Sequence, residues 1–243
     1  MFDLSHLPRM ALFAALAIIL VFAPLVSALF AKRGAQAGAR AKHARYARTL
    51  LIMWSITALA LWALRLHGQG PADVGFVPPS EPVLAYTAVL IFVFMLTVAG
   101  LASRRPVDQD YAERIRRIAP LTKSDWFWYV PVALSAGVCE EFLYRGYALT
   151  LLATLTGSVA VGVAVSTAAF GLAHAYQGWR GVVGTTIFGF YFAIVFVFWG
   201  SLWPCMLGHA LQDLIGGVIV ARRLAAVPPP SADPAQNAAQ GEP

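Results

Sequence analysis

The stretch WFWYVPVALSAGVCEEFLYRGYALTLLA, residues 126–153, is apolar enough to cross a lipid bilayer, yet it carries three charged residues near its middle. Glu140 and Glu141 are adjacent, and Arg145 follows one helical turn after Glu141. An ionisable side chain at bilayer depth costs about 3 kcal/mol on insertion scales, so such groups persist mainly where they face a bundle interior or a water-filled cavity. The stretch therefore predicts a membrane helix that contributes to a functional site.

The composition indicates a membrane protein rather than a soluble domain. Hydrophobic residues make up 59% of the 243 residues and charged residues only 12%, and the apolar residues fall in long blocks. Most blocks are close to the roughly 20 residues that span a bilayer. We therefore predict an all-α fold, a polytopic membrane helical bundle with about seven transmembrane helices. The expected spans are residues 10–30, 47–66, 82–102, 126–153, 158–175, 181–199 and 202–221.

Three parts of the chain differ in composition. Residues 1–124 hold three expected spans with basic loops, and the first span is expected to be retained because no clear signal-peptide cleavage site follows it. Residues 125–222 hold about four further spans with embedded polar side chains. Residues 223–243 form a Pro- and Ala-rich tail that is expected to be disordered. Residues 111–118 are expected to form a short helix at the membrane interface.

Lys and Arg are distributed unevenly between the expected spans. The loop after the first span is rich in basic residues and has no acid, residues 67–81 are nearly neutral, and residues 103–125 are again basic. Because cytoplasmic loops are enriched in Lys and Arg, the N-terminus is expected outside and the C-terminus in the cytoplasm, in a bacterial inner membrane. The net charge of +6 then serves orientation and attraction to membrane lipid. Nucleic acid is not an expected partner, since the basic loops lack interleaved aromatic residues.

The two adjacent acids are expected to play different parts. On a helix Glu141 and Arg145 share a face, whereas Glu140 points about 100 degrees away. The economical assignment pairs Arg145 with Glu141 as an orienting or neutralising partner and leaves Glu140 for proton transfer. A purely structural ion pair between Glu141 and Arg145 is the alternative.

Two other expected spans place histidines on faces rich in small residues. Phe170 and His174 share a face in the fifth span, and His209 and Asp213 share one in the seventh. The spacing of His209 and Asp213 is typical of a carboxylate that orients an imidazole. If the three faces meet, the bundle gathers carboxylates and imidazoles in one cavity. Taken singly, a membrane histidine is often only hydrogen-bonded across helices.

Together these motifs resemble the CPBP intramembrane proteases, a family that includes the CAAX prenyl endopeptidase and the bacteriocin-processing or Abi-type proteins. The resemblance covers roughly residues 125–220, which would be the catalytic core, and leaves the first three spans outside. Its motifs correspond to Glu140, Glu141 and Arg145, then to Phe170 and His174, then to His209 and Asp213. The order, spacing and helical context agree with the family pattern.

The resemblance implies glutamate-dependent hydrolysis of a peptide bond in or beside the bilayer. Glu140 and His174 would activate a water molecule, and His209 and Asp213 would stabilise the oxyanion. The prenyl endopeptidases have Asn where this chain has Asp213, so Asp213 must either be protonated to donate or act through His209. No cofactor is expected.

Two alternatives remain open at this stage. Glu140, His174 and His209 with an open fourth position would suit a catalytic zinc ion, although the chain has no His-Glu-x-x-His motif. The same side chains would also suit a non-enzymatic proton-coupled carrier or scaffold.

The expected substrate is a peptide or protein with a membrane-associated cleavage site. Maturation of a secreted peptide, or removal of a C-terminal sorting tail, is favoured over processing of prenylated proteins. Simple straight spans put the motifs at uneven depths, with His174 near the cytoplasmic end of its span and His209 nearer the outer end. A shared site therefore requires tilted, broken or shortened helices around a cavity.

Overall fold

The computed structural model describes residues 7–31, 39–80 and 109–227, together with Ile91, Val93, Thr97 and Gly100. Every regular element within these residues is a helix, which confirms the all-α class. The elements are α1 (Leu7–Ala17), η1 (Ile18–Phe22), α2 (Ala23–Ala31), α3 (Ala39–Leu66), η2 (Pro71–Val74), α5 (Gln109–Arg116), α6 (Lys123–Glu141), η3 (Phe142–Leu149), α7 (Thr150–Thr156), α8 (Val159–Leu172), η4 (Ala175–Gln177), α9 (Trp179–Trp199) and α10 (Trp203–Ala225).

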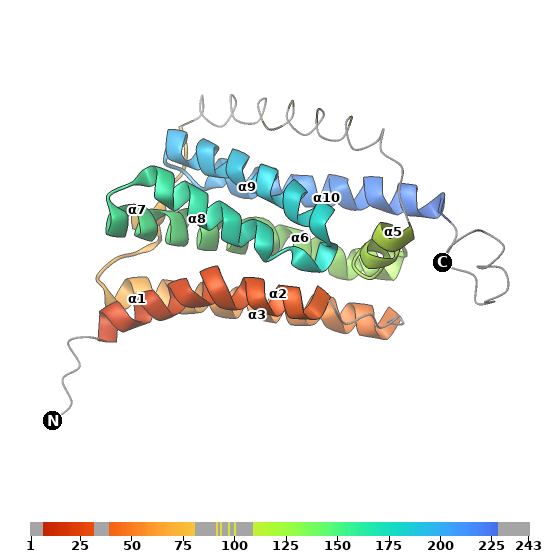
Figure 1. Ribbon diagram of the computed structural model, residues 1–243, viewed down its shortest axis with the longest axis horizontal. Coiled ribbons are helices and arrows are strands. Elements are labelled where there is room, and N and C mark those ends of the chain that lie inside the picture. The colour runs from red at the N-terminus through yellow and green to blue at the C-terminus, as the bar shows by residue number, and fades with distance from the viewer. Residues whose placement is uncertain are drawn as a thin grey trace.

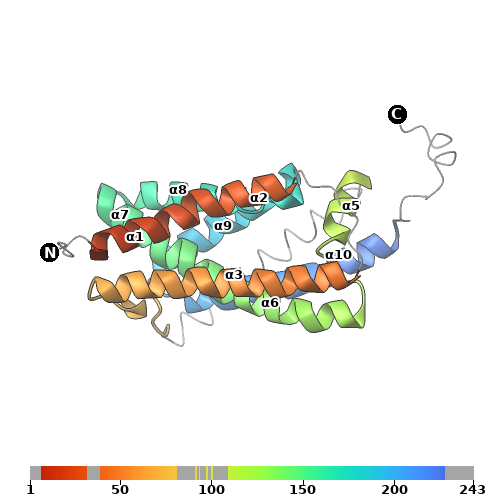
Figure 2. The same cartoon turned by 90° about the horizontal axis from the view of Figure 1, so that it is seen from below.

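The helices stack in layers (Figure 1). α1, α2 and α3 form one layer, α9 and α10 form another, and α6, α7 and α8 lie between them. α6 contacts both α3 and α10, and α8 contacts α9. Seen from below, the helix made by α1 and α2 runs beside α3 (Figure 2).

Four helices are long and apolar enough to cross a membrane: Arg9–Leu29, Arg40–Leu66, Trp179–Trp199 and Trp203–Ala225. They indicate an integral membrane protein. The seven expected spans are not shown. α6, η3 and α7 form one continuous helix, which is not among these four. α8 has 14 residues and is about 21 Å long, which is shorter than the roughly 30 Å hydrocarbon core.

Some sequence expectations fall on other parts of the chain. The expected span 82–102 lies outside the described residues except for four isolated helical positions, and most of the tail at 223–243 lies outside them too. The expected short helix near residue 111 is present as α5. The basic residues from Arg40 to Arg48, expected in a loop, belong instead to the first turns of α3.

The middle of the α6–α7 helix is the most enclosed part of the chain. From Phe142 to Leu149 the backbone forms a π-helix, and all eight of its residues are buried. A helix that is apolar all round is buried on every side, and π-helical turns often occur at functional sites. Glu141 immediately precedes this segment, so a carboxylate lies at the edge of the buried core.

Asp125 joins the first turn of α6 to the first turn of α3. Its carboxylate lies 3.1 Å from Lys42 Nζ and 3.0 Å from His43 Nε2, and it also accepts from the backbone N–H of Leu121 and Thr122. Burial raises the pKa of Asp125, but the hydrogen bonds outweigh this effect and hold the pKa below its ordinary value. The sequence analysis did not predict this cluster.

Gly137 allows α6 and α10 to approach closely. A Cβ atom there would lie 2.6 Å from the carbonyl oxygen of Met206 and 2.9 Å from the backbone nitrogen of Ala210. Both are backbone-level contacts, so a side chain would have to move one helix away from the other. This seam brings Glu140 and Glu141 next to His209.

We expect Gly137→Ala to lower stability by about 1–3 kcal/mol because the new methyl group overpacks the helix seam. Gly216→Ala on α10 is the matched control, since a Cβ atom there meets nothing within 4 Å. Thermal unfolding of the purified protein in detergent compares the two. Equal midpoints for both variants would show that the seam is not tightly packed.

We expect Asp125→Asn to lower stability at neutral pH by about 3 kcal/mol, because Lys42 is then buried without its carboxylate partner. Since the pKa of Asp125 is lowered in the folded state, its stabilisation is present above the ordinary Asp pKa and is lost as pH falls through the lowered value. The thermal difference from wild type should therefore shrink below about pH 4. Glu113→Gln, an exposed change on α5, should show no such difference at any pH.

Candidate active site

Glu141 lies at the end of α6 inside a network of buried charges. Its Oε1 is 2.9 Å from Arg145 Nη1, and the two side chains are 0% and 1% exposed. Arg145 Nη2 also donates to the carbonyl oxygen of Gly189 on α9 at 3.0 Å. A buried ion pair needs such extra hydrogen bonds to offset the cost of desolvation. The pairing of Glu141 with Arg145 is the one that the sequence spacing favours.

The same Glu141 oxygen also bonds to His209. His209 Nδ1 lies 2.7 Å from Glu141 Oε1, and because a carboxylate accepts, this ring nitrogen carries a proton and donates. The carboxylate that orients His209 is therefore Glu141. Asp213, which the sequence spacing suggested for this role, faces the other ring nitrogen, Nε2, at 3.8 Å.

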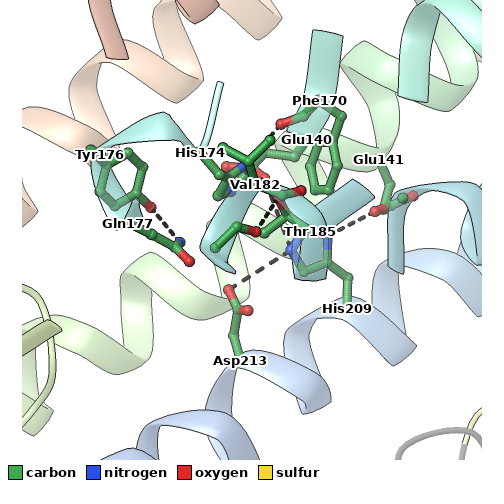
Figure 3. Close-up of polar contacts among 12 residues, drawn as sticks. Glu140, Glu141, Phe170, His174, Tyr176, Gln177, Val182, Thr185, His209 and Asp213 are labelled. Carbon is green, nitrogen blue, oxygen red and sulfur yellow. Dashed lines mark hydrogen bonds and ion pairs between the residues drawn. The ribbon is translucent and has the colours of Figure 1, made fainter. Parts of the chain in front are cut away.

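Glu140 lies between the two imidazoles (Figure 3). Its Oε2 is 3.7 Å from His174 Nε2 and 3.9 Å from His209 Nε2. Both distances exceed those of a direct hydrogen bond. Glu140 Oε2 is buried and has no hydrogen-bond partner among the described residues. Glu141 Oε2 is also buried without a partner among these residues, so what distinguishes Glu140 is its position between two imidazole nitrogens.

His174 is held by its own backbone. Its Nδ1 lies 2.8 Å from the carbonyl oxygen of Phe170, which can only accept, so Nδ1 carries a proton. In the neutral ring, Nε2 then presents a lone pair toward Glu140. The four-residue spacing of Phe170 and His174 has a structural reason, since this contact lies at the C-terminal end of α8, where carbonyl groups lack helical partners.

The Phe170 ring fills the space between the charged groups. Its centroid lies 4.7 Å from that of His174 and 5.9 Å from that of His209, and the Arg145 guanidinium carbon is 4.3 Å from it. Phe192 stacks on the other face of the site, with its ring 15° from the plane of His209. These rings exclude water from the charges and fix the orientation of both imidazoles.

The exposed fraction of the side chains increases across the site from His209 to Asp213. The His209 side chain is 5% exposed, whereas Asp213 is 31% exposed and Glu140 20%. Asp213 lies on the side of His209 that leads to the end of α10, where Arg222 and Arg223 are found. The more exposed side of the site is therefore the one that holds Asp213 and Glu140.

The uneven depths expected for straight spans do not occur. α7 ends at Gly157, which has the left-handed φ of 68°, and α8 returns antiparallel to the preceding helix. Because α8 is short, His174 at its C-terminal end is level with Glu140, roughly equidistant from the turn. α9 and α10 form a second hairpin that brings His209 beside Phe192. Shortened helices, one of the adjustments foreseen from the sequence, thus gather all the motifs.

Several contributors to the site have no sequence signal. The carbonyl oxygen of Gly189 and the ring of Phe192 come from α9, which carries no Asp, Glu, His, Lys or Arg near them. Tyr129 Oη donates to the backbone carbonyl of Asp213 at 2.9 Å.

For the zinc alternative, no group of three or more His, Cys, Asp or Glu side chains in the described part of the chain is arranged to hold a metal ion.

Comparison with known proteins agrees with the site. Residues 122–215 match the family model described as type II CAAX prenyl endopeptidase Rce1-like. No curated protein and no solved structure gives a significant match. The chain therefore carries a domain of the Rce1-like CAAX prenyl endopeptidase (CPBP) family at residues 122–215, as its motifs predicted. This family is one of proteases, and membership implies an intramembrane protease.

We expect Glu141→Gln and Arg145→Met each to lower stability by about 3 kcal/mol or more, because each leaves a buried charge without its partner. The double variant should cost less than the sum of the two, since it buries no unpaired charge of this pair. Thermal unfolding of wild type, the two single variants and the double variant completes this double-mutant cycle. Arg65→Met, at an exposed position of α3, is the control and should change stability by less than about 0.5 kcal/mol. Additive losses would mean that the pair is not coupled.

Proposed function

We propose that the protein hydrolyses a peptide bond in or near the membrane by a glutamate-dependent mechanism. The observation that carries the proposal is the position of Glu140 Oε2, buried, unpaired among the described residues and within 4 Å of two imidazole nitrogens, inside a domain of a protease family. The metal-free reaction needs only these side chains and water.

A water molecule bound between Glu140 and His174 would satisfy both. Glu140 Oε2 and the lone pair of neutral His174 Nε2 are both acceptors, and they are too far apart to bond directly. Water has two O–H groups and can donate one to each while keeping a lone pair for attack. In this arrangement Glu140 is the general base and His174 orients the nucleophile.

His209 is suited to stabilise the developing oxyanion. Its Nδ1–H is bound by Glu141, so in the imidazolium form Nε2–H is left to donate into the site. Glu141 and Asp213 supply the opposite charge on either side of the ring. Asp213 contributes through the charge it holds near His209 Nε2, or donates directly when protonated. Donors fixed before the reaction give the largest electrostatic benefit.

The proposed reaction proceeds in two proton transfers. The water oxygen attacks the carbonyl carbon as Glu140 takes its proton, and the carbonyl oxygen becomes an oxyanion beside His209. Glu140 then gives the proton to the amide nitrogen as the carbon–nitrogen bond breaks. The products are a carboxylic acid and an amine, and Glu140 returns to its starting state.

The proposed orientation follows from the charges at one end of the bundle. α5, the first turns of α3 and α6, and the end of α10 lie at the same end and carry most of the basic residues (Figure 1). We assign this end to the cytoplasm, where basic residues face anionic lipid headgroups, which places the N-terminus outside. The exposed side of the site then faces the cytoplasmic half of the membrane. Its substrate is a peptide or protein cleaved near the membrane, such as a secreted-peptide precursor or a C-terminal sorting tail.

We expect Glu140→Gln and Glu140→Ala to reduce cleavage of a membrane-peptide library at least about 100-fold, because the general base is lost. The purified protein in lipid is compared with both variants, each with and without a chelator, and products are identified by mass spectrometry. Glu113→Gln on the exposed face of α5 should keep wild-type activity.

The outcomes separate the mechanisms. Cleavage that requires Glu140 and is indifferent to chelator supports the proposal. Loss of cleavage with chelator that zinc restores would replace it with a metal-dependent reaction through Glu140, His174 and His209. A folded wild-type protein that cleaves no peptide in the library would overturn the protease function.

A further inference from the structure

The short segment η4, Ala175–Gln177, follows His174 directly and lies at the accessible side of the site. Tyr176 is 37% exposed, comparable to the 31% of the Asp213 side chain. Its ring centroid lies 5.9 Å from that of His174 (Figure 3). Tyr176 therefore lies beside His174 with part of its surface open to a molecule bound there.

η4 is fixed by its own turn and by contacts with two other elements, α2 and α9. The backbone N–H of Tyr176 donates to Ser27 Oγ on α2 at 3.2 Å, and the N–H of Gln177 donates to the carbonyl oxygen of His174 at 2.9 Å. The Gln177 side chain lies over Gly181 in the first turn of α9, where a Cβ atom would be 2.9 Å from its Oε1. The two side chains of η4 are thus held in place before any substrate binds.

Tyr176 and Gln177 bond to each other and leave one donor and one acceptor unused. Gln177 Nε2 donates to Tyr176 Oη at 3.1 Å. The phenol proton of Tyr176 then has no acceptor, and the amide oxygen of Gln177 has no donor, among the residues that the structure describes. An extended peptide segment presents the matching groups, one carbonyl and one N–H per residue.

The phenol of Tyr176 remains a donor over the working range of pH. Burial raises its pKa most; the hydrogen bond from Gln177 lowers the pKa, and the charges of Glu140 and Asp213 raise it by smaller amounts, so the net direction is upward. These two carboxylates belong to the site already described. Tyr176 is therefore exposed to the same electrostatic field that would act on a substrate bound there.

We propose that Tyr176 and Gln177 bind the main chain of the substrate next to the scissile bond, with the Tyr176 phenol donating to a substrate carbonyl and the Gln177 amide oxygen accepting a substrate N–H. This inference rests on the proposed protease function. In this role η4 binds the main chain of an extended substrate, irrespective of the substrate's side chains. Because Ser27 on α2 fixes the backbone of Tyr176, α2 contributes to substrate positioning.

The test uses one peptide that the wild-type protein cleaves in the library experiment, together with versions that are N-methylated at each residue flanking the cleaved bond. We expect Tyr176→Phe and Gln177→Leu each to reduce kcat/KM about three- to tenfold, the value of one hydrogen bond. N-methylation at one position should impair cleavage by wild type but cause no further loss in Gln177→Leu. Each variant is normalised to its own rate on the unmethylated peptide, so a reduced folded fraction cancels.

Tyr46→Phe is the matched control. It also removes a phenol that donates a hydrogen bond, here to the carbonyl oxygen of Ile118 far from the site, so it should lower the thermal midpoint and leave the N-methylation pattern unchanged. If Gln177→Leu keeps the wild-type pattern and both η4 variants keep wild-type kcat/KM, the role of η4 is wrong while the protease function stands. If Glu140→Gln cleaves the same peptide as fast as wild type, the protease mechanism itself is wrong.

Discussion

Glu141 holds a negative charge where almost no water reaches it, and the site depends on how this charge is neutralised. One of its oxygens accepts from both Arg145 and His209, so a single carboxylate joins its own helix to α10. Arg145 extends the network to the backbone of α9. Removing Glu141 leaves the buried Arg145 without a carboxylate partner, and breaking a buried pair in this way costs several kcal/mol. The network thus fixes both the relative positions of three helices and the ring nitrogen that His209 turns toward Glu140.

Close helix packing and aromatic rings make this network possible. Gly137 lets α10 approach α6 to backbone contact, and Phe170 lies against Arg145, His174 and His209 together. Glu140, one residue before Glu141, is left outside the network with an unused oxygen between two imidazoles. Adjacent acids therefore have different environments for a geometric reason, since successive helical residues point about 100 degrees apart. Glu141 bonds to Arg145 and His209 through one oxygen, whereas Glu140 Oε2 makes no hydrogen bond among the described residues and lies between two imidazoles.

Much of this arrangement was predictable from the sequence, and the errors have physical causes. The motif residues Glu140, Glu141, Arg145, Phe170, His174, His209 and Asp213 were selected because charged and polar groups are costly in apolar spans. The continuity of α6, η3 and α7 matches the single expected span at residues 126–153, whereas α8 is shorter than the expected span at residues 158–175. Four helices among the described residues are long and apolar enough to cross a membrane, so the number of seven spans stays a prediction. Asp213 was expected to orient His209 from its spacing on one helix, but the shorter contact comes from Glu141 on another helix.

The sequence by itself determined the helical membrane character, the family and the identity of the polar side chains, because apolar run length and residue spacing are local properties of the chain. Only the tertiary structure decided which side chains meet. The turn at Gly157, the seam at Gly137 and the return of α10 set the level at which His174 and His209 approach Glu140. The contacts of Tyr176 with Ser27 and Gln177 likewise have no local signal, since they join segments distant in the sequence or depend on loop geometry.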